Sequence, residues 1–229
     1  IADIKASADW SHKWHINGMS VGMVGTLNYT SDTRTYKDMQ NNLFGVYDIT
    51  NDRSNYLRNS TDNQYNDNKR LGALLNLALL SKSGNNKYEL KNIFNRIDNN
   101  RYTDRSGVNA QSDNEIGAEY YYRSRTTTNT QLTGKHTLPH DLLEWDLSYS
   151  YANRRMPDRK HYTIDDALEH GTMILTAGNE INREFTKLDE HIMSANFNEK
   201  HDFKFGSFEP SLKLGGYGEY RSRKYKTRQ

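Results

Sequence analysis

The chain of 229 residues is strongly polar, with 34% hydrophobic and 26% charged residues, a mean hydropathy of −1.00 and a formal net charge of +2. Because this charge is balanced, we expect no nucleic-acid partner. The lack of cysteine excludes disulfides, thiolate chemistry and cysteine-ligated metals. No stretch approaches the roughly 18 apolar residues of a membrane helix, so the chain is either soluble or crosses a membrane as strands.

Four pairs of strands are predicted, in chain order, from the alternation of apolar and polar residues. We expect short turns within the pairs, at 11–14, 83–86, 138–141 and 205–210, and long loops between the pairs, at 35–66, 99–114 and 155–184. Residues 71–80 also suit a buried helix, but the flanking polar loops and the turn at Gly84 favour a strand. The expected strands are 2–10 and 15–34, 67–81 and 87–98, 115–133 and 142–154, and 185–200 and 209–225.

The segment 142–154 shows the alternation best. Its apolar face carries Leu143, Trp145, Leu147, Tyr149 and Tyr151, and its polar face carries Glu144, Asp146, Ser148, Ser150 and Arg154. A soluble β-sandwich covers such an apolar face with a second sheet. An outer-membrane barrel turns the apolar face to lipid and keeps the polar face in its lumen.

The loops and the aromatic residues favour the barrel. Loops this long are uncommon in compact domains, whereas outer-membrane barrels combine short periplasmic turns with long extracellular loops. Two aromatic groups, at opposite ends of the strands, resemble interfacial girdles. They are Trp10, Trp14 and Trp145 near the short turns, and Tyr29, Tyr120, Tyr149, Tyr151 and Tyr220 nearer the long loops. The sequence therefore predicts an all-β chain that forms a transmembrane antiparallel β-barrel.

Three segments resemble the barrel region of TonB-dependent outer-membrane receptors, in particular those of Bacteroidetes-type bacteria. They are LPHDLLEWDLSYSYANRRMPDRKHY, REFTKLDEH and FGSFEPSLKLGGYGEYRSRKYKTR. The resemblance implies that residues 1–229 supply about eight strands of one 22-stranded barrel domain. The family's N-terminal plug domain and energy-coupling box are not found, and both ends of the sequence fall inside patterned stretches, so we expect a fragment of a longer protein.

The same resemblance implies a function and a location. The family carries out active uptake of siderophores, haem, cobalamin, glycans or peptides across the bacterial outer membrane. Its energy comes from the TonB complex, which acts through the plug. We therefore expect outer-membrane lipid and lipopolysaccharide around the barrel and a surface lipoprotein as a further partner, with no cofactor and no catalytic residues.

Candidate site residues fall into three groups. The lumen-facing candidates are Glu119, Tyr121, Arg123, Arg125, Glu144 and Asp146, and the basic candidates at the extracellular end are Arg154, Arg155, Arg159, Arg221 and Arg223. The basic residues suit an anionic substrate or lipid phosphates, although an ordinary charged rim has the same composition. Asp166 and His170 would meet on a helical turn and are weak metal candidates, and a solvated loop is the simpler interpretation.

Two other classes of protein remain open from the sequence. An outer-membrane barrel enzyme would need an acid, a histidine and a nucleophile together at the loop end, where Asp165, Asp166 and His170 are the only candidates. A soluble β-sheet protein that binds a surface would need a second layer over the apolar face of every strand.

Overall fold

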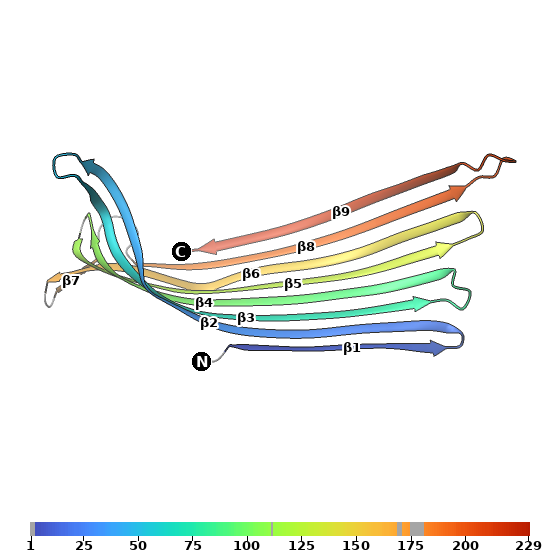
Figure 1. The fold of residues 1–229 in the computed structure, drawn as a ribbon, viewed down its shortest axis with the longest axis horizontal. Helices are drawn as coiled ribbons and strands as arrows, with labels where there is room; N and C mark the ends of the chain where they lie inside the picture. Colours follow the sequence, from blue (N-terminus) through green and yellow to red (C-terminus); the bar gives the residue numbers. More distant parts are fainter. Residues whose placement is uncertain (1–2, 111, 169–170, 175–180) are drawn as a thin grey trace.

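A single antiparallel sheet contains almost all of the residues that the computed structural model describes, which are 3–110, 112–168, 171–174 and 181–229. Eight strands follow one another in chain order across the sheet, and the short β7 pairs only with β6 (Figure 1). The strands are β1 (Ile4–Ile16), β2 (Met19–Asp48), β3 (Arg53–Leu80), β4 (Asn86–Asn109), β5 (Ser112–Thr137), β6 (Asp141–Leu168), β7 (Gly171–Ile174), β8 (Ile181–Asp202) and β9 (Ser211–Arg228). The all-β antiparallel prediction is thus confirmed.

The sheet is open and is not curled into a barrel. Its two edges are β1 and β9, which lie on opposite sides of the sheet (Figure 1). Among the described residues, no helix has the length and apolar character needed to cross a membrane. Residues 71–80 belong to β3, so the strand interpretation of this leucine-rich segment is confirmed and the helix is excluded.

The first turn lies later than the sequence suggested. The expected turn at 11–14 is wrong, because β1 continues to Ile16 and pairs with Met19 of β2. Asn17 and Gly18 form the connection, with φ of 51° and 82°. Two residues with positive φ suit the right-handed twist of the flanking strands, and Asn-Gly is the preferred pair for such a turn. The other three expected turns are confirmed, near Gly84, Pro139 and Gly206.

The long irregular loops are the main correction. Strands occupy most of 35–66, 99–114 and 155–184, because β2 extends to Asp48, β4 to Asn109 and β6 to Leu168. These extensions carry Asn, Asp, Arg and Tyr on both faces, so no alternation marks them in the sequence. Neighbouring strands satisfy their backbone groups, and cross-strand polar pairs such as Asn99 with Asn68 (2.7 Å) align their side chains.

The extended strands bend away from the rest of the sheet, most visibly at the tip of the β2–β3 hairpin (Figure 1). Register shifts lie in this part, between Tyr36 and Met39 of β2 and between Tyr120 and Ser124 of β5. Such bulges bend the bulged strand and increase its twist. At Gly107 the backbones approach closely, since a Cβ there would lie 2.4 Å from the carbonyl oxygen of Asn59.

Candidate functional site

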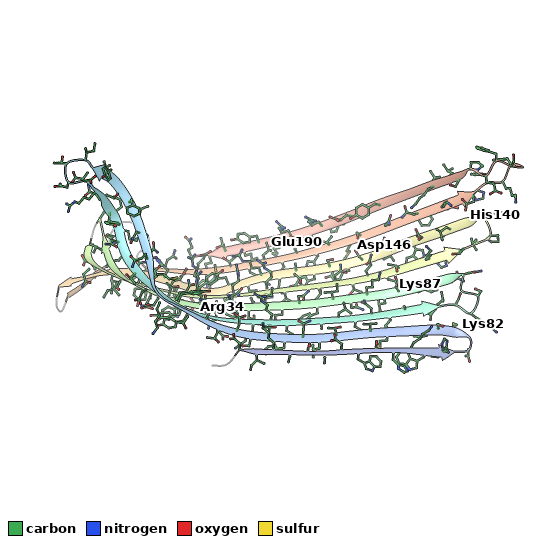
Figure 2. All side chains as sticks on the ribbon, viewed as in Figure 1. Arg34, Lys82, Lys87, His140, Asp146 and Glu190 are labelled. Atoms are coloured by element: carbon green, nitrogen blue, oxygen red, sulfur yellow. The ribbon has the colours of Figure 1, made fainter. Side chains whose placement is uncertain are left out.

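The strand register sorts the side chains into two faces. Residues directly opposite each other on paired strands share a face, and the face alternates along each strand. We call the face of Leu75, Leu77 and Leu147 the apolar face, and the face of Glu119, Glu144 and Ser148 the polar face. Figure 2 shows side chains extending from the sheet along its whole length.

A continuous apolar band crosses the apolar face next to the short turns. It consists of the apolar-face residues within Ile4–Ile16, Met19–Tyr29, Leu71–Leu79, Tyr88–Phe94, Thr128–Leu132, Leu143–Tyr151, His191–Phe197 and Leu212–Tyr220. Nothing among the described residues covers this band, and large side chains such as Leu147 and Met193 are 52% and 55% exposed. So large an exposed apolar surface indicates a partner or a membrane.

Aromatic side chains line the turn-side part of the band. Trp14, Tyr88, Trp145 and Phe197 occupy one register row across the sheet. The Trp145 ring lies over Gly134, where a Cβ would come within 2.3 Å of it, and its Nε1 donates a hydrogen bond to His136 (3.1 Å). An indole with an apolar body and a bonded N–H suits a boundary between apolar and wet surroundings.

A second aromatic group lies at the other boundary of the band. The Tyr149 hydroxyl lies 2.9 Å from Nδ1 of His191, and the Tyr151 hydroxyl donates to Asp189 at 2.9 Å. Tyr29 and Tyr220 lie at the same boundary on β2 and β9. Tyr120 does not, since it lies further out beside Tyr102, with ring centroids 4.8 Å apart.

The far boundary of the band shifts systematically across the sheet. One register row runs from Tyr29 on β2 to Lys224 on β9. On β2 the last apolar residue of this face is Tyr29, which Ser31 follows, but on β9 it is Tyr220, four residues nearer the turns than the row. At ~3.3 Å per residue and ~4.8 Å between strands, the boundary crosses the strands obliquely, about 25° from the register rows. A level apolar band on tilted strands has this geometry.

Buried side chains lie mostly on the polar face, which is therefore the inner side of the bend. On this face the buried residues are Ser60, Asp62, Glu115, Met156, Thr186 and Glu190, whereas Ala118 and Ser124 are buried on the apolar face. Side chains crowd together on the concave side of a curved sheet and spread apart on the convex side. The polar face is therefore concave and the apolar face is convex.

An ion-pair network occupies the concave face beyond the band. Glu119 accepts hydrogen bonds from Arg101 at 2.7 Å and from Arg159 at 2.7 Å, and Arg159 also pairs with Glu184 at 3.2 Å. The Tyr121 ring lies among three guanidinium groups, those of Arg101 (4.9 Å), Arg123 (5.8 Å) and Arg159 (5.9 Å).

Asp62 and Arg105 form the other centre of this network, with two hydrogen bonds of 2.7 and 2.9 Å. Burial raises the pKa of Asp62, but the bonds from Arg105 and Asn41 outweigh burial, so the pKa lies below its ordinary value. The pKa of Glu119 is lowered in the same way, because Arg159 and Arg101 outweigh its desolvation. Both carboxylates are therefore charged at neutral pH.

The structure brings together part of the candidate set. Glu119, Tyr121, Arg123 and Arg159 belong to the ion-pair network. Arg125 lies directly opposite Arg154 on the same face, and among the described residues neither forms an ion pair. Like charges in this arrangement destabilise a sheet.

The remaining candidates are dispersed. Glu144 and Asp146 share the polar face but lie near the short turns, where Glu144 pairs with Lys135 at 2.8 Å. Figure 2 shows Asp146 and Glu190 at different levels of the sheet. Arg221 (3.8 Å) and Arg223 contact Glu190 on the polar face, just beyond the level of Tyr220, the last apolar residue of β9.

Arg155 and the weak metal candidates complete the set. Arg155 projects from the apolar face, opposite Lys187. Residues 165–168 continue β6 as a strand, so the helical turn is wrong there, and His170 and the side chain of Asp166 lie outside the described part. Within the described part, no group of three or more His, Asp or Glu is arranged to hold a metal.

The sequence interpretation missed Asp62, Arg101 and Arg105, because it assigned their segments to loops. The only signal was that Arg101, Thr103 and Arg105 would share one face of an extended segment, and a solvated loop also shows such a pattern. Comparison of the chain with protein-family models, with curated proteins and with solved structures finds no match.

Proposed function

We propose that this chain forms part of the wall of an outer-membrane β-barrel that takes up a scarce nutrient, a receptor of the TonB-dependent type. The observation that carries the membrane assignment is the convex apolar band with its oblique boundary. On barrel strands tilted by roughly 35–45°, a level hydrocarbon layer crosses the register rows at a similar angle. The ~25° estimated from Tyr29 and Tyr220 is also oblique, although it lies below this range.

The height of the band supports the same proposal. On β3 the band runs from Leu71 to Leu79, which is ~26 Å along the strand. A tilt of 30–40° reduces this length to a height of ~20–23 Å, near the ~25 Å apolar band of outer-membrane barrels. Tryptophan and tyrosine at the two boundaries then lie at the headgroup levels. The core of a soluble β-sandwich does not require tryptophan and tyrosine at two boundaries of its apolar face.

The open edges of the sheet indicate what else the barrel needs. Unpaired N–H and C=O groups on β1 and β9 would be costly in lipid, where water cannot satisfy them. We infer that further strands pair with both edges and complete the barrel. If the chain refolded alone in detergent gave a closed barrel with heat-dependent mobility on a gel, this inference would be refuted.

The transport assignment rests on the resemblance of the β5–β6 and β8–β9 hairpins to TonB-dependent receptors. Energy would come from the TonB complex through a plug in the lumen, and siderophores, haem, cobalamin, glycans and peptides are the substrate classes. A barrel enzyme is less well supported. Among the described residues, Glu119 accepts hydrogen bonds from Arg101 and Arg159, and no hydrogen bond joins the nearby His161 to a hydroxyl nucleophile.

The decisive experiment measures which face meets lipid. Single cysteines replace Leu147 and its neighbour Ser148, and then Leu75 and Asn76, in the assembled protein in membranes. The chain has no cysteine of its own, so labelling is specific. We expect a lipid-soluble probe to label positions 147 and 75, and a water-soluble probe to label 148 and 76. Protection of both members of each pair would mean a dry core and would reject the barrel.

A further inference from the structure

We infer that a basic groove on the convex face, just beyond the apolar band, binds the phosphate group of an anionic membrane lipid. The groove has a volume of about 630 Å³ and lies across β6, β8 and β9. Its cations are Arg155, Lys187, Lys224 and Lys226, and Asp189 is its one carboxylate. This inference rests on the proposed membrane location of the band.

The cations of the groove are arranged unfavourably for a protein without a bound anion. Arg155, Lys187 and Lys226 lie directly opposite one another on three neighbouring strands, with no acidic residue between them in the row. Like charges in such positions repel. Only Lys187 is paired, with Asp189 at 3.0 Å, and the other three cations form no ion pair within the described chain. An anion with several oxygens would offset this repulsion.

The position of the groove identifies the anion as a lipid group. All of its lining residues project from the apolar face, and Tyr149 and Tyr151 at the edge of the band form its lower wall. Lys224 and Arg155 each lie ~13 Å along the strands beyond the last tyrosine of their strand, or roughly 10 Å in height. This height lies at the outer margin of the headgroup layer, which is ~5–8 Å thick on each side of the hydrocarbon core, and long cationic side chains can reach back into it. A substrate in the lumen would meet the opposite face.

The neighbouring hydrogen bonds keep the groove open and basic. The Asp189 carboxylate forms an ion pair with Lys187 on the same strand and accepts a hydrogen bond from the Tyr151 hydroxyl of β6 at 2.9 Å. His191 is held against Tyr149 at 2.9 Å. Lys224 lies directly opposite Asp189, but among the described residues Arg155, Lys224 and Lys226 form no ion pair, so they can contact an added phosphate from two sides of β8.

The test compares a groove variant with a matched control in the assembled protein, purified in neutral detergent. Arg155→Gln with Lys226→Gln removes two groove cations. Lys200→Gln with Lys213→Gln removes two cations that lie opposite each other near the short turn, on the polar face. Dissociation constants for phosphatidic acid, for phosphatidylcholine and for inorganic phosphate are measured by native mass spectrometry.

We expect phosphatidic acid to bind the parent protein and the control alike, and the groove variant to bind at least about tenfold more weakly. Phosphatidylcholine should bind all three equally and more weakly. Equal phosphatidic acid binding by the groove variant and the control would overturn the inference. Inorganic phosphate that binds as tightly as the lipid would also overturn it, in favour of a soluble anion.

The labelling of Leu147→Cys separates the two proposals. If the lipid-soluble probe labels position 147 but the groove variant keeps its affinity, only the lipid site is rejected. If position 147 is not labelled by the lipid-soluble probe, the membrane location fails and the lipid site fails with it.

Discussion

Replacing Leu75 with arginine would place a charge at the centre of the apolar band. On β3 the band runs from Leu71 to Leu79, so position 75 lies ~13 Å along the strand from either end. An arginine side chain extends only about half that distance from the backbone, so its head group would remain in the hydrocarbon. On the lipid face of an outer-membrane barrel, arginine near the midplane costs ~2–4 kcal/mol.

Asn76→Arg is the matched control. Position 76 is the next residue on the same strand, but it projects from the polar face, opposite Lys91. We expect this substitution to lower the free energy of unfolding by less than about 1 kcal/mol, through repulsion by Lys91. Urea unfolding of the assembled protein in phospholipid bilayers measures both values. Equal costs for Leu75→Arg and Asn76→Arg would show that the leucine face does not meet lipid.

Three further substitutions test the packing and charge of the sheet by the same unfolding measurement. Glu119→Gln should lower the free energy of unfolding by roughly 1–2 kcal/mol at pH 7, a value discounted for the part-exposed arginines. Because the folded state lowers the pKa of Glu119, the stabilisation by its carboxylate is full above about pH 4.3 and disappears as the pH falls through the folded pKa. The parent protein should therefore lose more stability in acid than the variant. Gly107→Ala should cost about 1–3 kcal/mol, because its Cβ meets backbone at 2.4 Å, whereas Gly22→Ala, with open space, should cost less than about 0.5 kcal/mol. Arg125→Thr removes the like-charged pair with Arg154 and should raise the free energy of unfolding by roughly 0.2–1 kcal/mol, and a loss instead would mean that Arg125 has a stabilising partner.

Much of the strand pattern near the short turns was predictable. The period-two order of residues 142–154 places Leu147 and Ser148 on opposite faces, and the register confirms this for neighbouring strands. The turn at Gly84 followed from residues that tolerate positive φ. The Asn17–Gly18 turn carries the same signal, although the first turn was expected at 11–14.

The candidate site was predictable only in its parts. Glu119, Tyr121 and Arg123 alternate along one strand, so a common face followed from the sequence. Their partners Arg101 and Arg159 lie on neighbouring strands, in segments without an apolar face, and only the register brings them to Glu119. A segment whose two faces are both polar gives no signal of strand structure, although its backbone pairs as well as any other.

The sequence by itself determined which side chains share a face within each strand, because the alternation of side chains is a property of the extended backbone. Tertiary structure alone decided how the strands align with one another, since each one-residue shift would exchange the two faces. It thereby decided three things: the oblique boundary of the apolar band from Tyr29 to Tyr220, the meeting of Glu119 with Arg159, and the row of cations at Arg155. Each of these depends on hydrogen-bonded pairing between residues far apart in the chain, which no local pattern records.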